Sequence, residues 1–99
     1  MNMTLINRGT EGEMQIIGRL DTNTSPDAEK PLLDAINRFD KVILDMAQLE
    51  YVSSAGLRAL KSAHLAMRRK GGTLAVKNVG KQVMEVFEIT GFVGMLKFV

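Results

Sequence analysis

The sequence predicts an α/β domain with a mostly parallel central sheet, and three observations support this prediction. Short apolar segments alternate along the chain with longer segments of helical periodicity. The resulting order, β-β-α-β-α-β-α-β, makes each later helix a crossover between parallel strands. The 99 residues, 45% hydrophobic and 24% charged, suffice for one cored domain but not for two. We therefore expect residues 1–99 to form a single domain with helices packed on the sheet.

An N-terminal hairpin is predicted to give this sheet an antiparallel start. The first strand is expected over residues 3–8, where Met3, Leu5 and Asn7 alternate with Thr4, Ile6 and Arg8. A second strand, Met14–Ile17, follows a turn around Gly12. The glycine-containing connection is looser than a tight two-residue turn.

The first helix is predicted to follow a loop of capping and turn-forming residues, 21–26. Ser25 followed by Pro26 is typical of an N-cap and the first helical position. Four apolar residues then recur at helical spacing: Leu32, Leu33, Ile36 and Phe39. Pro31 would cost a hydrogen bond inside a helix, so either the helix begins near Pro31 or its first turns are irregular.

The middle of the chain predicts a buried strand and a second helix. Lys41–Met46 is short and apolar, which is typical of a central parallel strand covered on both faces. A helix follows from about Ser53 to Lys70, and Gly71-Gly72 ends it because glycine readily adopts a left-handed C-cap. Its apolar side carries Leu57, Leu60, Ala63 and Met67. Its polar side carries Arg58, Lys61, Ser62 and Arg69.

Three further elements complete the predicted fold. Thr73–Lys77 is a strand, Gly80–Thr90 is a helix stopped by Gly91, and Met95–Val99 is a closing edge strand. Since an exposed edge can pair with a second copy, we expect a monomer or a weak homodimer.

The composition argues against several functional classes. Without cysteine the chain has no disulfide, thiolate metal site or cysteine nucleophile, and the single His64 cannot build a common zinc site. Asp45 and Glu50 lie near a strand end without a matching nucleophile and base, and Asp45 is expected to order the loop that follows. We therefore expect no catalytic residues, no metal, no cofactor and no enzyme activity.

Charge and hydropathy give no sign of nucleic-acid binding or a membrane span. The net charge is +2, and the basic run Arg68–Lys70 falls at a helix C-terminus, where cations complement the helix dipole. No apolar segment approaches the roughly 20 residues of a membrane span, and no signal peptide is recognisable. The expected location is the cytoplasm.

The serine pair Ser53-Ser54 stands where a buried strand leads through a short loop into a helix. The free N–H groups and positive dipole end of a first helical turn can hold a phosphate, so a serine there suits a regulatory phosphate. Serine is also a favoured N-cap, and position alone favours the cap.

This segment resembles the signature of the STAS domain family, particularly its anti-sigma factor antagonists. The family runs through Tyr-Ile-Ser-Ser-Ala-Gly-Leu into a helix, and residues 51–57 read Tyr-Val-Ser-Ser-Ala-Gly-Leu. A second family signature, Gly-X-Leu-Asp-X-X-Thr, is matched by residues 18–24. The two glycines before a strand, at 71–72, and the segment 87–92 also fit, so the resemblance covers essentially the whole chain.

The resemblance implies a partner-switching role. In such systems the unmodified antagonist binds an anti-sigma factor, itself a serine kinase, and so frees a sigma factor. Phosphorylation of the helix-start serine ends binding, and a serine phosphatase resets the protein. By position Ser54 matches the phosphoacceptor, Ser53 is the alternative because many members have aspartate there, and Asp21 matches an acidic loop residue. The implied docking residues are Asp21, Thr22, Asn23, Thr24, Ser53, Ser54, Ala55, Gly56, Arg58 and Lys61.

Two other functional classes remain open from the sequence. The first is a constitutive STAS subunit of a larger complex, in lipid trafficking or a stress-signalling scaffold, without phosphoswitching. The second is a small-ligand sensor that uses a cleft beside the Asp21 loop.

Overall fold

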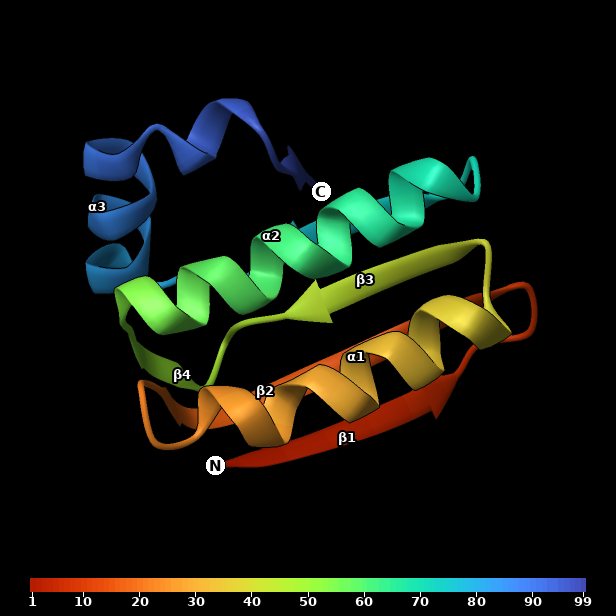
Figure 1. Ribbon diagram of the computed structural model, residues 1–99, viewed down its shortest axis with the longest axis horizontal. Helices are drawn as coiled ribbons and strands as arrows, with labels where there is room; N and C mark the ends of the chain where they lie inside the picture. The colour runs from red at the N-terminus through yellow and green to blue at the C-terminus, as the bar shows by residue number, and fades with distance from the viewer.

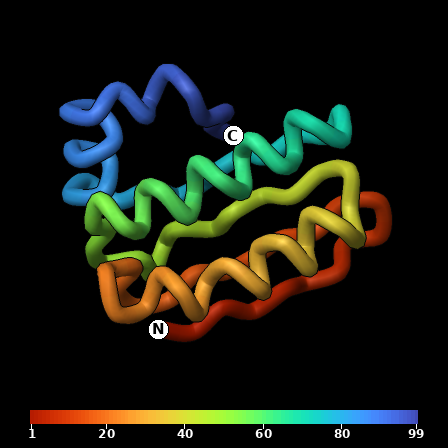
Figure 2. The backbone as a smooth tube through the Cα atoms, in the orientation of Figure 1, coloured from red at the N-terminus to blue at the C-terminus, as the bar shows by residue number.

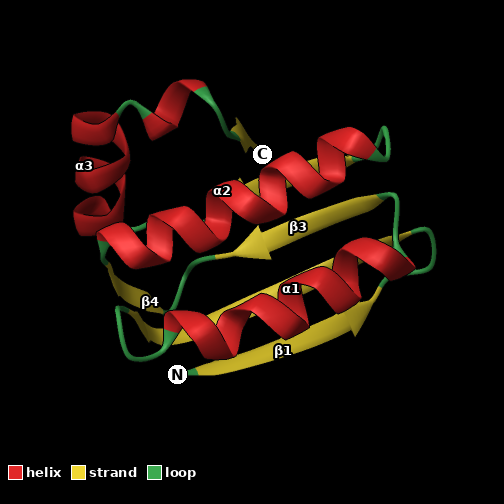
Figure 3. Ribbon diagram, viewed as in Figure 1, coloured by secondary structure: helices red, strands yellow, loops and turns green.

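A mixed sheet covered on one face by two helices forms the frame of the molecule (Figure 1). The computed structural model describes residues 1–99. The elements are β1 (Asn2–Asn7), β2 (Glu11–Leu20), α1 (Ser25–Arg38), β3 (Lys41–Asp45), β4 (Leu49–Val52), α2 (Ser54–Arg69), β5 (Thr73–Lys77), α3 (Lys81–Thr90), a 3₁₀ turn (Phe92–Gly94) and β6 (Lys97–Phe98). The sheet order is β1-β2-β3-β5-β6, with β4 also paired to β2. Figure 3 shows α1 and α2 in front of the strands. Only β1 and β2 are antiparallel, which confirms the predicted α/β class and N-terminal hairpin.

Strand β2 is the longest strand and organises the sheet. It pairs with β1, with β3, and then, past a register shift between Gly18 and Arg19, with β4. The predicted strand Met14–Ile17 was therefore too short, and β4 was not predicted. The hairpin turn also lies at Gly9, whose φ of 84° requires glycine, and not at Gly12, which lies under the ring of Phe39. The additional strand brings the start of α2 beside the end of β2.

Helix α1 differs from both possibilities considered for Pro31. It begins at Ser25 and continues regularly through Pro31. The carbonyl that Pro31 leaves without a partner belongs to Asp27, an exposed residue where water can bond to it. The N-cap is Thr24 and not Ser25, which is the first helical residue and whose hydroxyl donates to the backbone carbonyl of Asp21.

Helices α1 and α2 lie side by side on the same face of the sheet (Figures 1 and 2). The core lies between these helices and the inward side chains of the central strands: Met14, Ile16, Val42, Leu44, Leu74 and Val76. Burial alternates along β3, where Val42 and Leu44 are buried and Ile43 is partly exposed. The prediction that both faces of this strand are covered was therefore wrong, although β3 is central and parallel as expected.

Charged side chains replace a helix layer on the other face of the sheet. Glu13, only 5% exposed, pairs with Arg8 at 2.6 Å and with Lys77 on β5. The pKa of Glu13 lies below its usual value, first because the Lys77 ammonium donates to the carboxylate and second because Arg8 does. Polar groups therefore cover this part of the sheet without a second apolar layer.

The C-terminal segment closes the core at the end of the sheet. Phe87 of α3 packs on Phe92 and Phe98, with ring centroids 5.6 and 6.5 Å apart. Gly91 ends α3 as predicted, whereas Gly80, expected to be the first helical residue, is the N-cap before it. The predicted strand from Met95 to Val99 shortens to the two residues of β6, because Leu96 before it turns into the core.

Candidate functional site at the start of helix α2

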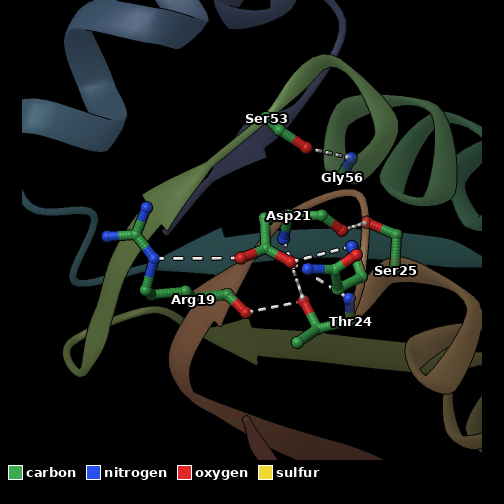
Figure 4. A network of polar contacts seen from close by, with 7 residues as sticks. Arg19, Asp21, Thr24, Ser25, Ser53 and Gly56 are labelled. Atoms are coloured by element: carbon green, nitrogen blue, oxygen red, sulfur yellow. Dashed lines mark hydrogen bonds and ion pairs between the residues drawn. The ribbon is translucent and has the colours of Figure 1, made fainter.

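Two distant sequence motifs meet where β2 and β4 end. Arg19 and Leu20 pair with Tyr51 and Val52, and the backbone N–H of Ser53 donates to the carbonyl of Leu20 at 2.9 Å. The loop that begins at Asp21 therefore lies beside Ser53, the first residue of the serine pair (Figure 4). This adjacency depends on β4.

Gly56 allows α2 to approach β2 closely. A Cβ atom at Gly56 would lie 2.6 Å from the carbonyl oxygen of Leu20 and 2.9 Å from the side chains of Leu20 and Val52. Residue 56 is buried, so the glycine of the motif is required for positioning and offers no side chain to a partner. Ala55 before it is half-buried, and its small side chain lines a groove between α1 and α2.

The Asp21 carboxylate organises its own loop (Figure 4). Its Oδ1 accepts from the backbone N–H groups of Asn23 and Thr24, both at 3.0 Å. The Thr24 hydroxyl accepts from the Asp21 N–H at 2.9 Å and donates to the Arg19 carbonyl at 2.8 Å. The donors to the carboxylate, first the Thr24 N–H and then the Asn23 N–H, hold the pKa of Asp21 below its usual value. The Asp-X-X-Thr motif therefore fixes the turn into α1.

Arg19 stands at the edge of this loop. Its guanidinium lies 4.4 Å from the ring centroid of Tyr51, and its Nε lies 3.8 Å from the Asp21 carboxylate. This stacking was not predicted, because it depends on the pairing of β2 with the unpredicted β4. It holds an aromatic side chain, 40% exposed, on the surface next to the motif.

The two serines have different environments. Ser53 is half-buried with extended backbone, and its Oγ accepts from the Gly56 N–H at 3.2 Å, so Ser53 is the N-cap. Ser54 is the first residue of α2, is exposed, and its hydroxyl forms no hydrogen bond within the chain. Of the two serines, only Ser54 therefore has a hydroxyl that is both accessible and uncommitted.

A groove of about 290 Å³ separates the N-terminal halves of α1 and α2. Its lining is mostly polar: Thr22, Ser25, Pro26, Glu29, Ala55, Arg58, Ala59 and Ser62. Among the predicted docking residues, Thr22, Ala55 and Arg58 contribute to this groove, whereas Asn23 and Lys61 are exposed outside its lining. The contribution of α1 was not predicted, since nothing local in 25–29 marks it.

The remaining candidates occupy structural positions or stand apart from the site. Asp45 accepts from the Ala47 N–H and from the Asn78 amide, both at 3.1 Å, which orders the turn after β3 as predicted. His64 is half-buried on α2, and no three His, Cys, Asp or Glu side chains are grouped so as to hold a metal ion. None of the helices has the length and apolarity needed to cross a bilayer.

The chain is similar in sequence to proteins that are named as anti-sigma factor antagonists. A segment of 55 residues is 40% identical to BtrV of Bordetella bronchiseptica, covering 56% of this chain and 47%, about half, of that protein. The anti-sigma-B factor antagonist of Bacillus subtilis is 23% identical over 93 residues, covering 92% of this chain and 85% of that protein.

Solved structures share the fold. The anti-sigma factor antagonist SpoIIAA superposes with a TM-score of 0.83 in its unphosphorylated form and 0.75 in its phosphorylated form. The identities are 16% and 15%, and 99% of this chain is covered in each case, against 88% and 91% of SpoIIAA. The family model of the STAS domain matches residues 4–99, and the chain therefore belongs to the STAS domain family.

Proposed function

We propose that this chain is an anti-sigma factor antagonist, a binding protein without enzyme activity that acts in the cytoplasm. Its docking surface consists of the Asp21–Thr24 loop, the turn from Ser53 to Ala55 that the buried Gly56 positions, and the exposed Arg58 and Lys61 of α2. The observation that carries the proposal is the exposed, unbonded hydroxyl of Ser54 beside this loop. The names of the matched relatives support the same function.

Phosphorylation of Ser54 is the proposed switch. An anti-sigma factor with kinase activity transfers the γ-phosphoryl group of ATP to Ser54 Oγ, whose proton is released, and ADP leaves. The product carries about −1.5 to −2 added charges where a partner must dock closely. Burying that charge against the partner costs several kcal/mol unless the partner neutralises it. A serine phosphatase would restore binding.

The geometry favours Ser54 over Ser53 as the acceptor. The Ser53 hydroxyl caps the Gly56 N–H, so modifying it would compete with the helix start, whereas the Ser54 hydroxyl has no structural role within the chain. The existence of SpoIIAA structures in unphosphorylated and phosphorylated forms, both with this fold, supports a switch that leaves the fold intact.

Intact-mass measurement and phosphopeptide mapping of the protein from its own cells would test the acceptor. One added phosphate on Ser54 is expected, and Ser54→Ala should abolish it while Ser53→Ala retains it. A phosphate found only on Ser53 would overturn the assignment.

Binding of the co-purifying partner would test the switch. Ser54→Asp should weaken binding strongly, and Ser54→Ala should bind as the wild type does. A chain that is never modified and remains in one stable complex, with binding unchanged in Ser54→Asp, would instead indicate a constitutive STAS subunit.

A further inference from the structure

Arg58 stands one helical turn beyond Ser54 and has no partner in the chain. Both residues are exposed on α2, and their backbone positions differ by four residues, about 6 Å along the helix axis. Arg58 takes part in none of the six ion pairs of the structure. Glu29, which lines the same groove, lies beyond the 4.0 Å ion-pair distance. The guanidinium is therefore uncommitted.

The other arginines cannot serve the same position. Arg8 pairs with Glu13 on the open face of the sheet, and Arg38 lies over Phe39 at the far end of α1. Arg19 is occupied by Tyr51 and Asp21. The two remaining arginines end α2, more than two turns beyond Arg58. Arg58 is thus the one free guanidinium within a helical turn of the Ser54 hydroxyl.

Helix geometry directs Arg58 towards Ser54. Side chains on a helix lean towards its N-terminus, so residue i+4 reaches back over residue i. Acid–base pairs at this spacing are neighbours on the helix surface. A guanidinium presents two parallel N–H groups, which match two oxygens of a phosphate.

We propose that Arg58 is the intrachain partner of the phosphate on Ser54, so that phosphorylation also removes a free cation from the docking surface. This inference rests on the proposed modification of Ser54. Before modification, Ser54 and Arg58 offer a neutral hydroxyl and an uncommitted cation one turn apart. Afterwards the phosphate adds negative charge and the guanidinium turns to it, so both features are lost to a partner in one step.

A phosphate titration would test this pairing without the kinase or the partner. Phosphoserine is incorporated at position 54 during translation, and the ³¹P chemical shift is followed against pH. Three proteins are compared: otherwise wild-type chain, Arg58→Gln, and the matched control Lys61→Gln, whose cation is two turns from residue 54. Because the pair favours the dianion, Arg58→Gln should raise the second pKa of the phosphate by about 0.3 pH units.

The control and the contrary outcome are defined by the same titration. Lys61→Gln should shift the phosphate pKa by clearly less than Arg58→Gln. Equal shifts in the two variants, or no shift in Arg58→Gln, would overturn the pairing. Absence of phosphate on Ser54 in cells would refute the proposed function alone, since the titration uses phosphoserine installed independently of any kinase.

Discussion

Replacing Ser53 by alanine removes the side chain that caps α2, and the structure sets the expected cost. The lost bond, from the Gly56 N–H to Ser53 Oγ, is 3.2 Å long. This length favours a free-energy cost in the lower part of the range that is usual for the loss of an N-cap. The Gly56 N–H would however stay buried without an acceptor, which favours the upper part. We therefore expect Ser53→Ala to lower the free energy of unfolding by about 1 kcal/mol.

Ser54→Ala is the matched comparison for this prediction. Ser54 is exposed and bonds to nothing within the chain, so the substitution should change stability by less than about 0.5 kcal/mol. Urea unfolding of both variants measures the difference, and thermal unfolding should show Ser53→Ala melting about 4–8 °C lower. Equal losses in the two variants, or a larger loss in Ser54→Ala, would refute the distinction between cap and free hydroxyl.

Three other predictions follow from the same contacts. Gly56→Ala should cost about 1–3 kcal/mol of unfolding free energy, because its Cβ would overlap the Leu20 carbonyl; wild-type stability in urea would contradict the close approach. The folded-state pKa values of Glu13 and Asp21 are lowered, so their stabilisation is complete above the unfolded values near 4 and is lost as the pH falls through the folded values. The free energy of unfolding should therefore fall between pH 6 and pH 2, and Glu13→Gln should lessen this fall. A flat profile would count against both the ion pairs of Glu13 and the hydrogen bonds of Asp21. Phosphoserine at 54 should raise stability slightly, by about 0.3–1 kcal/mol, because a negative charge at a helix N-terminus is favourable; a melting temperature several degrees lower would indicate that the phosphate disrupts the loop.

Local patterns predicted most of the elements correctly. The helical periodicity of α2 and the glycines that end α2 and α3 depend on neighbouring residues only, and their predicted bounds agree with the structure to within one or two residues. The predictions that were wrong concerned contacts between residues distant in sequence. Strand β4 is four residues long and forms because it pairs with the end of β2, and the apolar residues of β3 did not reveal that one face lacks a helix. Pro31 was misread because burial of the α1 face outweighs one lost hydrogen bond.

In the candidate site, too, local motifs were predicted correctly and contacts between distant residues were not. The motifs identified Asp21 and the serine pair, but their spacing along the chain could not separate the roles of Ser53 and Ser54, because adjacent serines at a helix start look alike until the cap geometry is known. The Arg19–Tyr51 stacking requires the β2–β4 register, so a sequence without that strand could not indicate it.

The residues that build the surface at the start of α2 are not the residue that carries the proposed switch, so the switch can act without unfolding the domain. The cap, the close approach and the loop are held by Ser53, Gly56 and the Asp21 carboxylate, none of which needs the Ser54 hydroxyl. The Asp21 carboxylate is hydrogen-bonded to its own loop and cannot turn towards residue 54 without losing those bonds. Its charge therefore repels a phosphate on Ser54 only from the distance that this loop fixes. A phosphate on Ser54 would therefore change the charge of the surface while the contacts that build the surface remain. Under the proposed function, loss of binding would follow from the altered electrostatics of docking, and the same fold would be ready to bind again once the phosphate is removed.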